Sequence, residues 1–233
     1  MTSGERLADA PPAVGAIVER MRALRAALPA RDGVAVFNEL YLSVTEEVDQ
    51  RLARGGYFAD SAATAHLCAR FAERFLDAVA AASAGRRTRA CWRPLILARQ
   101  HRGVAPMQFA LAGINAHVGH DLPLAVVDTC EELELHPREI AADYQRVGDL
   151  LEALEERIRD DLMPGPDALD VADPLTHLAG SWSLDRAREG AWSAAKVLWR
   201  LRELPEVGEE FEQRLDQSIG LVSRCLLVPL NGR

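Results

Sequence analysis

Lysine is almost missing from this sequence: Lys196 is the only lysine among 27 basic residues, and the others are arginine. Alanine is abundant, and the two biases together are typical of GC-rich coding DNA, so a single arginine carries little functional information. The net charge is −8 and the isoelectric point is near 5.3. Nucleic-acid binding needs a basic surface that releases counterions from phosphates. Because basic and aromatic residues are nowhere interleaved, the composition argues against a DNA or RNA partner.

Closely spaced cysteines are also missing. The four cysteines lie far apart and form no C-x-x-C pair, which excludes zinc-ribbon and thioredoxin-like motifs. Their apolar or helical neighbours predict reduced, buried thiols. The four are Cys68, Cys91, Cys130 and Cys225.

Long hydrophobic runs are absent as well. No segment approaches the roughly 20 apolar residues that a membrane-spanning helix needs. Residues 1–12 lack the apolar stretch of a signal peptide. We therefore expect a cytoplasmic protein without a membrane partner. The 233 residues, 48% hydrophobic and 27% charged, have the balance of a globular protein with one large core.

Apolar residues recur with helical period through nearly the whole chain, and no stretch alternates with period two. We expect an all-α fold of about eight or nine helices in a single domain over residues 14–233. A flexible tail is expected over residues 1–13, and a loop or connector over residues 163–183. Gly55 and Gly56 should end one helix, Pro106 should begin another, and Pro123 should restart or kink the chain.

One segment, Gly113–Pro123 (GINAHVGHDLP), is the place where chemistry is most strongly indicated. Residues three and four apart share a helix face, so His117, His120 and Asp121 should project together. Two imidazoles and a carboxylate suit a divalent transition metal, zinc or iron, with positions left open for substrate. Structural roles are the alternative: Asp121 as a helix cap, His117 as a hydrogen-bonded core residue, and His120 in solvent.

Two further polar residues fall on apolar helix faces. Asp143 lies where the pattern of its helix calls for an apolar residue, and a charge there must be paired or bind something. Tyr41 lies on the apolar stripe of an earlier helix, so its hydroxyl should point inward. We expect His117, Asp121 and Asp143 to converge. Asn115, two residues before His117, should instead point to the opposite side and bond a neighbouring helix or loop.

The run Gly113–Pro123 resembles the signature G-[IM]-N-A-H-[IV]-x-x-D-L-P of a helical family of uncharacterised bacterial and fungal proteins, known as a domain of unknown function. In that family an aspartate follows on a later helix and an A-W pair near the end, which correspond here to Asp143 and Ala191-Trp192. The resemblance spans roughly residues 32 to 200. It implies that His117 and Asp121 are the functional pair, since His120 falls at a variable position of the signature. A looser similarity links the H-D-L stretch to helical metalloproteins, including a ubiquinone-biosynthesis protein with different ligand spacing.

Two functions remain open from the sequence. The first is an enzyme that acts on a small, partly apolar organic molecule, for example from specialised metabolism. In it, His117 and Asp121 serve as metal ligands or as an acid/base pair, with Asp143 and Tyr41 across the pocket. A histidine held by a carboxylate should have a raised pKa and act near neutral pH. The second is a non-catalytic helical module that binds a small ligand or a partner, with a purely structural His/Asp network.

Overall fold

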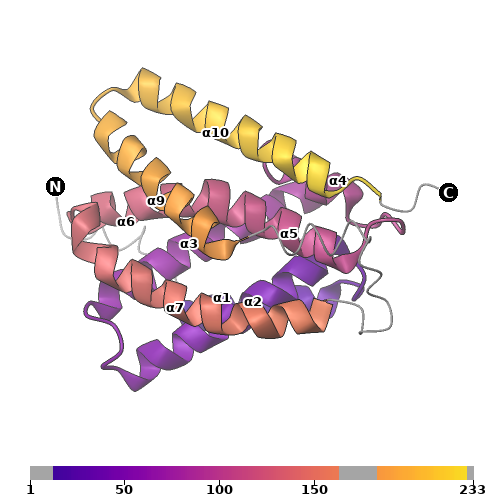
Figure 1. The fold of residues 1–233 in the computed structure, drawn as a ribbon, viewed down its shortest axis with the longest axis horizontal. Helices are drawn as coiled ribbons and strands as arrows, with labels where there is room; N and C mark the ends of the chain where they lie inside the picture. Colours follow the sequence, from indigo (N-terminus) through magenta and orange to yellow (C-terminus); the bar gives the residue numbers. More distant parts are fainter. Residues whose placement is uncertain (1–12, 163–182, 230–233) are drawn as a thin grey trace.

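The computed structural model describes residues 13–162 and 183–229, and these residues are helical with no strand among them (Figure 1). The predicted all-α, single-domain fold is confirmed. The expected tail and connector lie outside the described residues, except for Ala13 and Ser183. The helices are α1 (Val14–Ala27), α2 (Gly33–Arg54), α3 (Ser61–Ser83), α4 (Arg93–Ala98), α5 (Pro106–Ala116), α6 (Leu122–Glu132), α7 (Pro137–Leu162), α9 (Leu184–Leu201) and α10 (Pro205–Leu226), with a π turn, η1 (His117–Asp121), between α5 and α6.

Local chemistry sets the ends of α2 and α3. The Asp32 carboxylate accepts the Val34 N–H at 2.9 Å and so caps α2. Asp60 does the same for α3 by accepting the Ala63 N–H at 2.9 Å. Gly55 ends α2 with a φ of 67°, a left-handed conformation that glycine adopts without strain.

The helix α5, the π turn η1 and the helix α6 form one continuous rod, so the described residues hold eight separate helices. Pro123 lies in the first turn of α6, and the helical path continues through it. The Leu122 N–H bonds the His117 carbonyl five residues back, and this wider turn lies directly before the proline. A proline has no N–H with which to continue the normal ladder, and a π turn is one way in which a helix adjusts to that loss.

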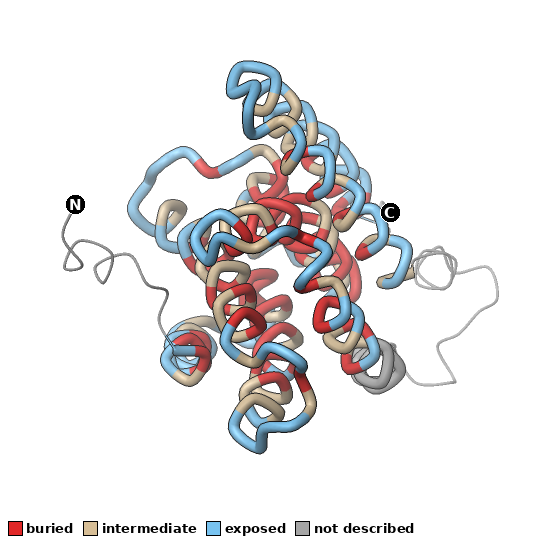
Figure 2. Tube along the Cα trace, turned by 90° about the vertical axis from the view of Figure 1, so that its left-hand side faces the viewer, coloured by how far each residue is buried: buried red, intermediate tan, exposed pale blue. Residues whose placement is uncertain are grey.

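The rod lies at the centre of the molecule. Helices α2 and α3 contact it from one side, and α9 and α10 contact it from the other (Figure 1). Buried residues concentrate along this axis, as Figure 2 shows. Two large apolar clusters divide the rod between them: the first includes residues of α5, and the second includes residues of η1 and α6. The partly buried side chains of Phe71 and Ile114 pack against both. The side chains of the rod that the sequence singled out therefore lie deep in the core.

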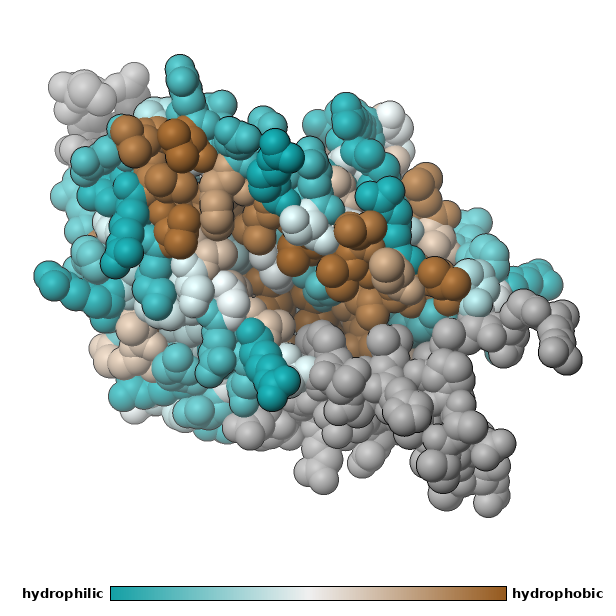
Figure 3. Space-filling view, turned by 45° about the horizontal axis from the view of Figure 1, so that its top comes forward, coloured by the Kyte–Doolittle hydropathy of each residue, from teal (hydrophilic) through white to brown (hydrophobic). Residues whose placement is uncertain are grey.

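On the face that carries α9 and α10, separate apolar patches lie among hydrophilic residues (Figure 3). None of the described helices combines the length and the apolar character that crossing a membrane requires. All four cysteines are free, but their predicted burial holds only in part. Cys91 and Cys130 are buried, Cys68 is half-buried and Cys225 is exposed.

Candidate functional site

The π turn decides where the two histidines of the segment point. In a regular helix His117, His120 and Asp121 would share one face. The π turn is wider, and the rings of His117 and His120 approach Asp121 separately. His117 lies against α2 and α3, whereas His120 lies near Cys91 and Asp216. Turns of this kind are rare and often occur at functional sites.

Asp121 is the centre of a buried hydrogen-bond network. Its Oδ2 lies 3.0 Å from His117 Nδ1, and its Oδ1 lies 2.9 Å from His120 Nδ1. The indole N–H of Trp92 also donates to Oδ2, at 2.9 Å. Burial alone would raise the pKa of Asp121, but the hydrogen bonds from the two histidines outweigh it and hold the pKa well below its usual range. Asp121 is therefore an ionised carboxylate inside the core.

His117 lies in an aromatic enclosure. Its ring stacks on Phe71 with centroids 3.6 Å apart and planes only 6° from parallel. The ring of Tyr41 meets it edge-on at 4.5 Å, and Trp92 lies at 5.9 Å. Burial lowers the pKa of His117 and outweighs the opposite effect of Asp121. The expectation of a raised pKa is therefore wrong, because aromatic side chains replace water on the faces of the ring.

Tyr41 packs against the His117 ring. Its ring is buried and packs against both His117 and Phe71. Burial raises the pKa of the Tyr41 hydroxyl well above its ordinary value, and the nearby Asp121 charge raises it further. Tyr41 therefore keeps its proton at neutral pH.

In both histidines, one ring nitrogen has no hydrogen-bond partner. His117 is 2% exposed and His120 is fully buried, and neither Nε2 atom has a hydrogen-bond partner. Because each Nδ1 faces the Asp121 anion, Nδ1 carries the proton and Nε2 carries the lone pair. An unpaired polar atom in a core costs about 1–3 kcal/mol. Here two such nitrogen atoms lie on histidines that share one carboxylate, and hydrogen bonding within the core does not explain why both are unpaired.

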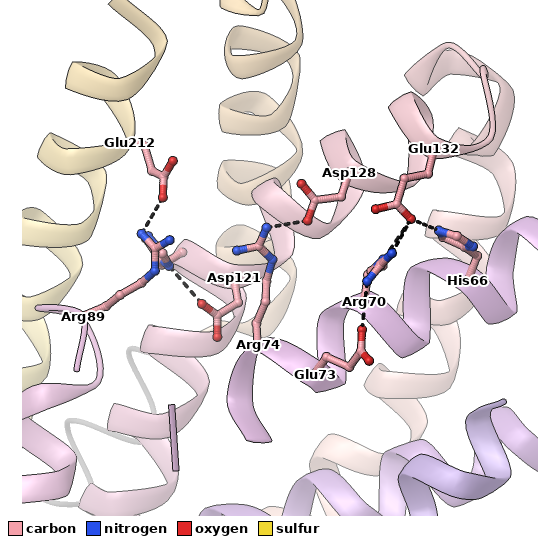
Figure 4. Close-up of polar contacts among 10 residues, drawn as sticks. His66, Arg70, Glu73, Arg74, Arg89, Asp121, Asp128, Glu132 and Glu212 are labelled. Carbon is pink, nitrogen blue, oxygen red and sulfur yellow. Dashed lines mark hydrogen bonds and ion pairs between the residues drawn. The ribbon is translucent and has the colours of Figure 1, made fainter. Parts of the chain in front are cut away.

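A cavity of about 460 Å³ adjoins this network. Asp121 and Trp92 line it, and the side chains of Ala78 and Ala81 on α3 add an apolar wall. The other lining residues are Arg74, Asp77, Arg86, Arg87, Thr88 and Arg89. Figure 4 shows Asp121 between two of these arginines, Arg74 and Arg89.

The arginines of the cavity differ in how they are paired. Arg74 bonds Asp128 of α6, and Arg89 bonds Glu212 of α10 (Figure 4). Arg86 and Arg87 are exposed and form no ion pair with any residue that the structure describes. Neither the Arg86 nor the Arg87 guanidinium is paired within the described residues, so both are available to an anion in the cavity.

Asp143 does not join the site. Its carboxylate accepts the backbone N–H groups of Ala59 at 2.8 Å and Asp60 at 2.7 Å, and it pairs with Arg146. Burial would raise the pKa of Asp143, but these hydrogen bonds lower it below its usual value. The predicted convergence with His117 is therefore wrong. The charge on the apolar face of α7 is satisfied by the turn before α3.

Asn115 behaves as predicted. Its side-chain N–H groups donate to the Ile219 carbonyl at 3.0 Å and to the Ser223 hydroxyl at 2.9 Å, both on α10. His117 faces the opposite side, toward α2 and α3. The asparagine thus fixes α10 to the rod, and the histidine belongs to the buried network.

The expected metal set of His117, His120 and Asp121 does not gather around one point, because each histidine bonds a different oxygen of Asp121. Sequence reasoning missed Trp92, the third donor to Asp121, and the neighbours of His120, which are Cys91 and Asp216. One signal for Cys91 and Trp92 was available in the sequence. A reactive residue and a large aromatic residue stand together directly before α4, whose first turn contains Pro94. Asp216 carried none, because it looks like any acidic residue of a polar helix face.

These features define an all-α protein with a buried histidine–aspartate–histidine centre beside an arginine-rich cavity. The chain belongs to a family described as a family of unknown function (DUF5995), which it matches over residues 14–229. The predicted membership in a helical family of unknown function is thereby confirmed. Neither a curated protein nor a solved structure is detectably similar to this chain.

Proposed function

We propose that this protein is an enzyme that binds a small, partly apolar organic anion in the arginine-rich cavity and acts on it by proton transfer through the His117–Asp121 pair. One observation carries the proposal. Asp121 orients two buried histidines that each keep a free ring nitrogen, and the same carboxylate lines the cavity.

The cavity favours an anion with an apolar part. Arg86 and Arg87 are free to pair with a carboxylate or phosphate group, for which the planar guanidinium is well suited. Trp92, Ala78 and Ala81 supply an apolar surface for the remainder of the ligand. Pockets of this size with a few polar groups are the usual sites of small molecules.

The His117–Asp121 pair has the properties of a general base. Burial keeps the His117 imidazole neutral, and the bond to Asp121 leaves its lone pair on Nε2. Asp121 stabilises the imidazolium that forms when this nitrogen takes a proton. Trp92 and Asp121 both contact His117 and line the cavity, so the network joins the histidine to the cavity wall. Tyr41, which stays protonated, packs against the His117 ring.

A cytoplasmic location and a substrate from specialised metabolism belong to the same proposal. The four free cysteines suit a reducing compartment.

A second candidate function is a binding module without catalysis. It is favoured by the burial of both imidazoles, which are 2% and 0% exposed, while neither histidine lines the cavity. In such a module the network would hold Trp92 and the cavity wall in place, and the anion would bind without reaction.

The test begins with ligand binding. We expect small carboxylates and phosphate monoesters with an apolar group to raise the melting temperature of the protein. Replacing Arg86 and Arg87 together by alanine should weaken binding at least about tenfold, which is about 1.4 kcal/mol. The matched control replaces Arg20 and Arg102, two exposed arginines outside the cavity, and should bind like the wild type.

Turnover then separates the two functions. Each bound compound is incubated with the protein, and products are measured by mass spectrometry. An enzyme converts at least one ligand, and His117→Gln reduces the turnover at least about a hundredfold while binding is retained. Binding without conversion of any ligand favours the module, and equal binding by the Arg86/Arg87 variant contradicts the cavity assignment.

A further inference from the structure

Cys91, His120 and Asp216 come together from three distant parts of the chain. Cys91 lies just before α4, His120 lies in the π turn, and Asp216 lies in the middle of α10. The thiol sulfur, a ring nitrogen and a carboxylate oxygen of the three all lie within 4.8 Å of one another. Cys91 and His120 are buried, and Asp216 is half-buried. In the part of the chain that the structure describes, these are the side chains that converge closely enough to share a metal ion.

His120 supplies an independent sign that something binds here. Its ring is fully buried, and its Nδ1 is committed to Asp121 Oδ1 at 2.9 Å. Nε2 is therefore the nitrogen available to the cluster, and it has no hydrogen-bond partner. The carboxylate of Asp121 fixes the ring orientation and the proton on Nδ1, as carboxylates that bond the other ring nitrogen do for histidines that bind metals.

The backbone holds Cys91 against α10. Asp216 accepts the N–H groups of Ala90 and Cys91, each at 2.8 Å, one on each carboxylate oxygen. Gly220, one turn further along α10, allows this approach, because a Cβ there would lie 2.4 Å from the Ala90 carbonyl oxygen. Each oxygen of Asp216 retains a further lone pair. The ligand atoms are thus positioned by contacts that do not use up their capacity to bind a cation.

Hydrogen bonds among the three side chains can satisfy Cys91 and Asp216 but not His120. The Cys91 thiol can donate its proton to Asp216, which satisfies both. This arrangement leaves His120 Nε2 without a partner in the core, whereas a cation between the three groups satisfies it.

We propose that Cys91, His120 and Asp216 bind one divalent transition-metal ion. A thiolate, an imidazole and a carboxylate together suit zinc, and three protein ligands leave a fourth position for water or substrate. On binding, the metal replaces the proton of the Cys91 thiol, and this proton is released to solvent. Trp92 and Arg89, on either side of the Ala90–Cys91 pair, line the cavity, so the site lies beside the region assigned to the ligand. The inference does not depend on the proposed enzyme activity, because metal binding is measured without any substrate.

The experiment titrates chelator-treated full-length protein with Zn²⁺ by calorimetry and with Co²⁺ by absorption spectroscopy. We expect about one Zn²⁺ per chain and, with Co²⁺, a thiolate-to-metal charge-transfer band in the near ultraviolet. Cys91→Ser should abolish this band and weaken Zn²⁺ binding at least about tenfold. Cys225→Ser is the matched control, since it removes an exposed cysteine of α10 outside the cluster, and it should behave like the wild type.

Two results would overturn the inference: wild-type protein that binds no Zn²⁺, or a Cys91→Ser variant that keeps the charge-transfer band. Circular dichroism checks that each variant is folded. If Cys91→Ser does not fold, X-ray absorption of zinc-loaded wild-type protein decides instead. One sulfur ligand at about 2.3 Å supports the site, and a zinc environment without sulfur refutes it.

Discussion

At the residue scale, His117 and His120 show how much the surroundings of a side chain decide its chemistry. Both bond the same carboxylate through Nδ1, and both leave Nε2 unpaired. His117 is enclosed by aromatic rings, so its free nitrogen is suited to proton transfer with an organic ligand. His120 faces a thiol and a carboxylate, so its free nitrogen is suited to a metal.

The buried His117 predicts a dependence of stability on pH. Burial lowers its pKa from 6.5 in the folded state, so below about pH 6.5 the unfolded chain binds a proton that the folded chain does not. Folding stability should therefore fall as the pH drops below this value, by at most about 1.4 kcal/mol per pH unit from this one group. Urea unfolding at about pH 7.5 and about pH 5.5 measures the slope.

The variant His117→Gln should show a shallower loss of stability across the same pH range, because the titrating group is gone. His101→Gln, at an exposed histidine, serves as the control and should keep the wild-type slope. An unchanged slope in His117→Gln would show that the folded protein accepts the proton on His117 after all.

At the element scale, the rod of α5, η1 and α6 depends on glycines that allow close packing. A Cβ at Gly113 would lie 2.3 Å from the ring of Phe37, which is itself 1% exposed. The ring cannot move away, because Phe75 and Trp92 pack against it at centroid distances of 5.0 and 5.5 Å. The glycine of the signature segment therefore has a packing role, separate from any chemistry.

We expect Gly113→Ala to destabilise the protein by about 1–3 kcal/mol, the usual cost of overpacking a core. The matched control is Gly190→Ala on α9, where a Cβ meets no atom within 4 Å. That substitution should stabilise the protein by up to about 1 kcal/mol, because alanine is the better helix former. Urea unfolding of both variants provides the comparison, and a neutral Gly113→Ala would mean that the core around Phe37 can relax.

At the scale of the whole molecule, the two apolar clusters are joined rather than separate. Phe71 and Ile114 pack against both of them, and the rod contributes α5 to the first cluster and α6 to the second. The exposed apolar side chains lie elsewhere, mainly around α4, the link between α9 and α10, and the end of α10 (Figure 3). The large hydrophobic residues with the highest fractional exposure are Leu97, Leu204, Val207, Leu221 and Val228.

Shared packing predicts one cooperative unfolding transition. Trp92 belongs to the first cluster, whereas Trp192 and Trp199 pack against the second. Tryptophan fluorescence and far-ultraviolet circular dichroism should therefore give the same midpoint in urea. Two separated midpoints would show that the two clusters unfold independently.

The sequence by itself determined the helices and most of their ends. Helical periodicity predicted the all-α class, and Gly55 and Pro106 marked boundaries because backbone freedom is a local property. The spacing of Asn115 and His117 correctly predicted that they point apart. The pairing of His117 with Asp121 was also accessible, since it joins residues one turn apart.

The tertiary structure alone decided what each polar group meets. Asp143 and Asp216 are both acidic residues on helices, yet one caps the turn before α3 and the other lies beside His120. The π turn, the Trp92 donor and the lowered pKa of His117 arise from packing between elements far apart in the chain. Periodicity records which face of a helix is buried, but not which side chain of another helix lies opposite, and the chemistry of this centre depends on those partners.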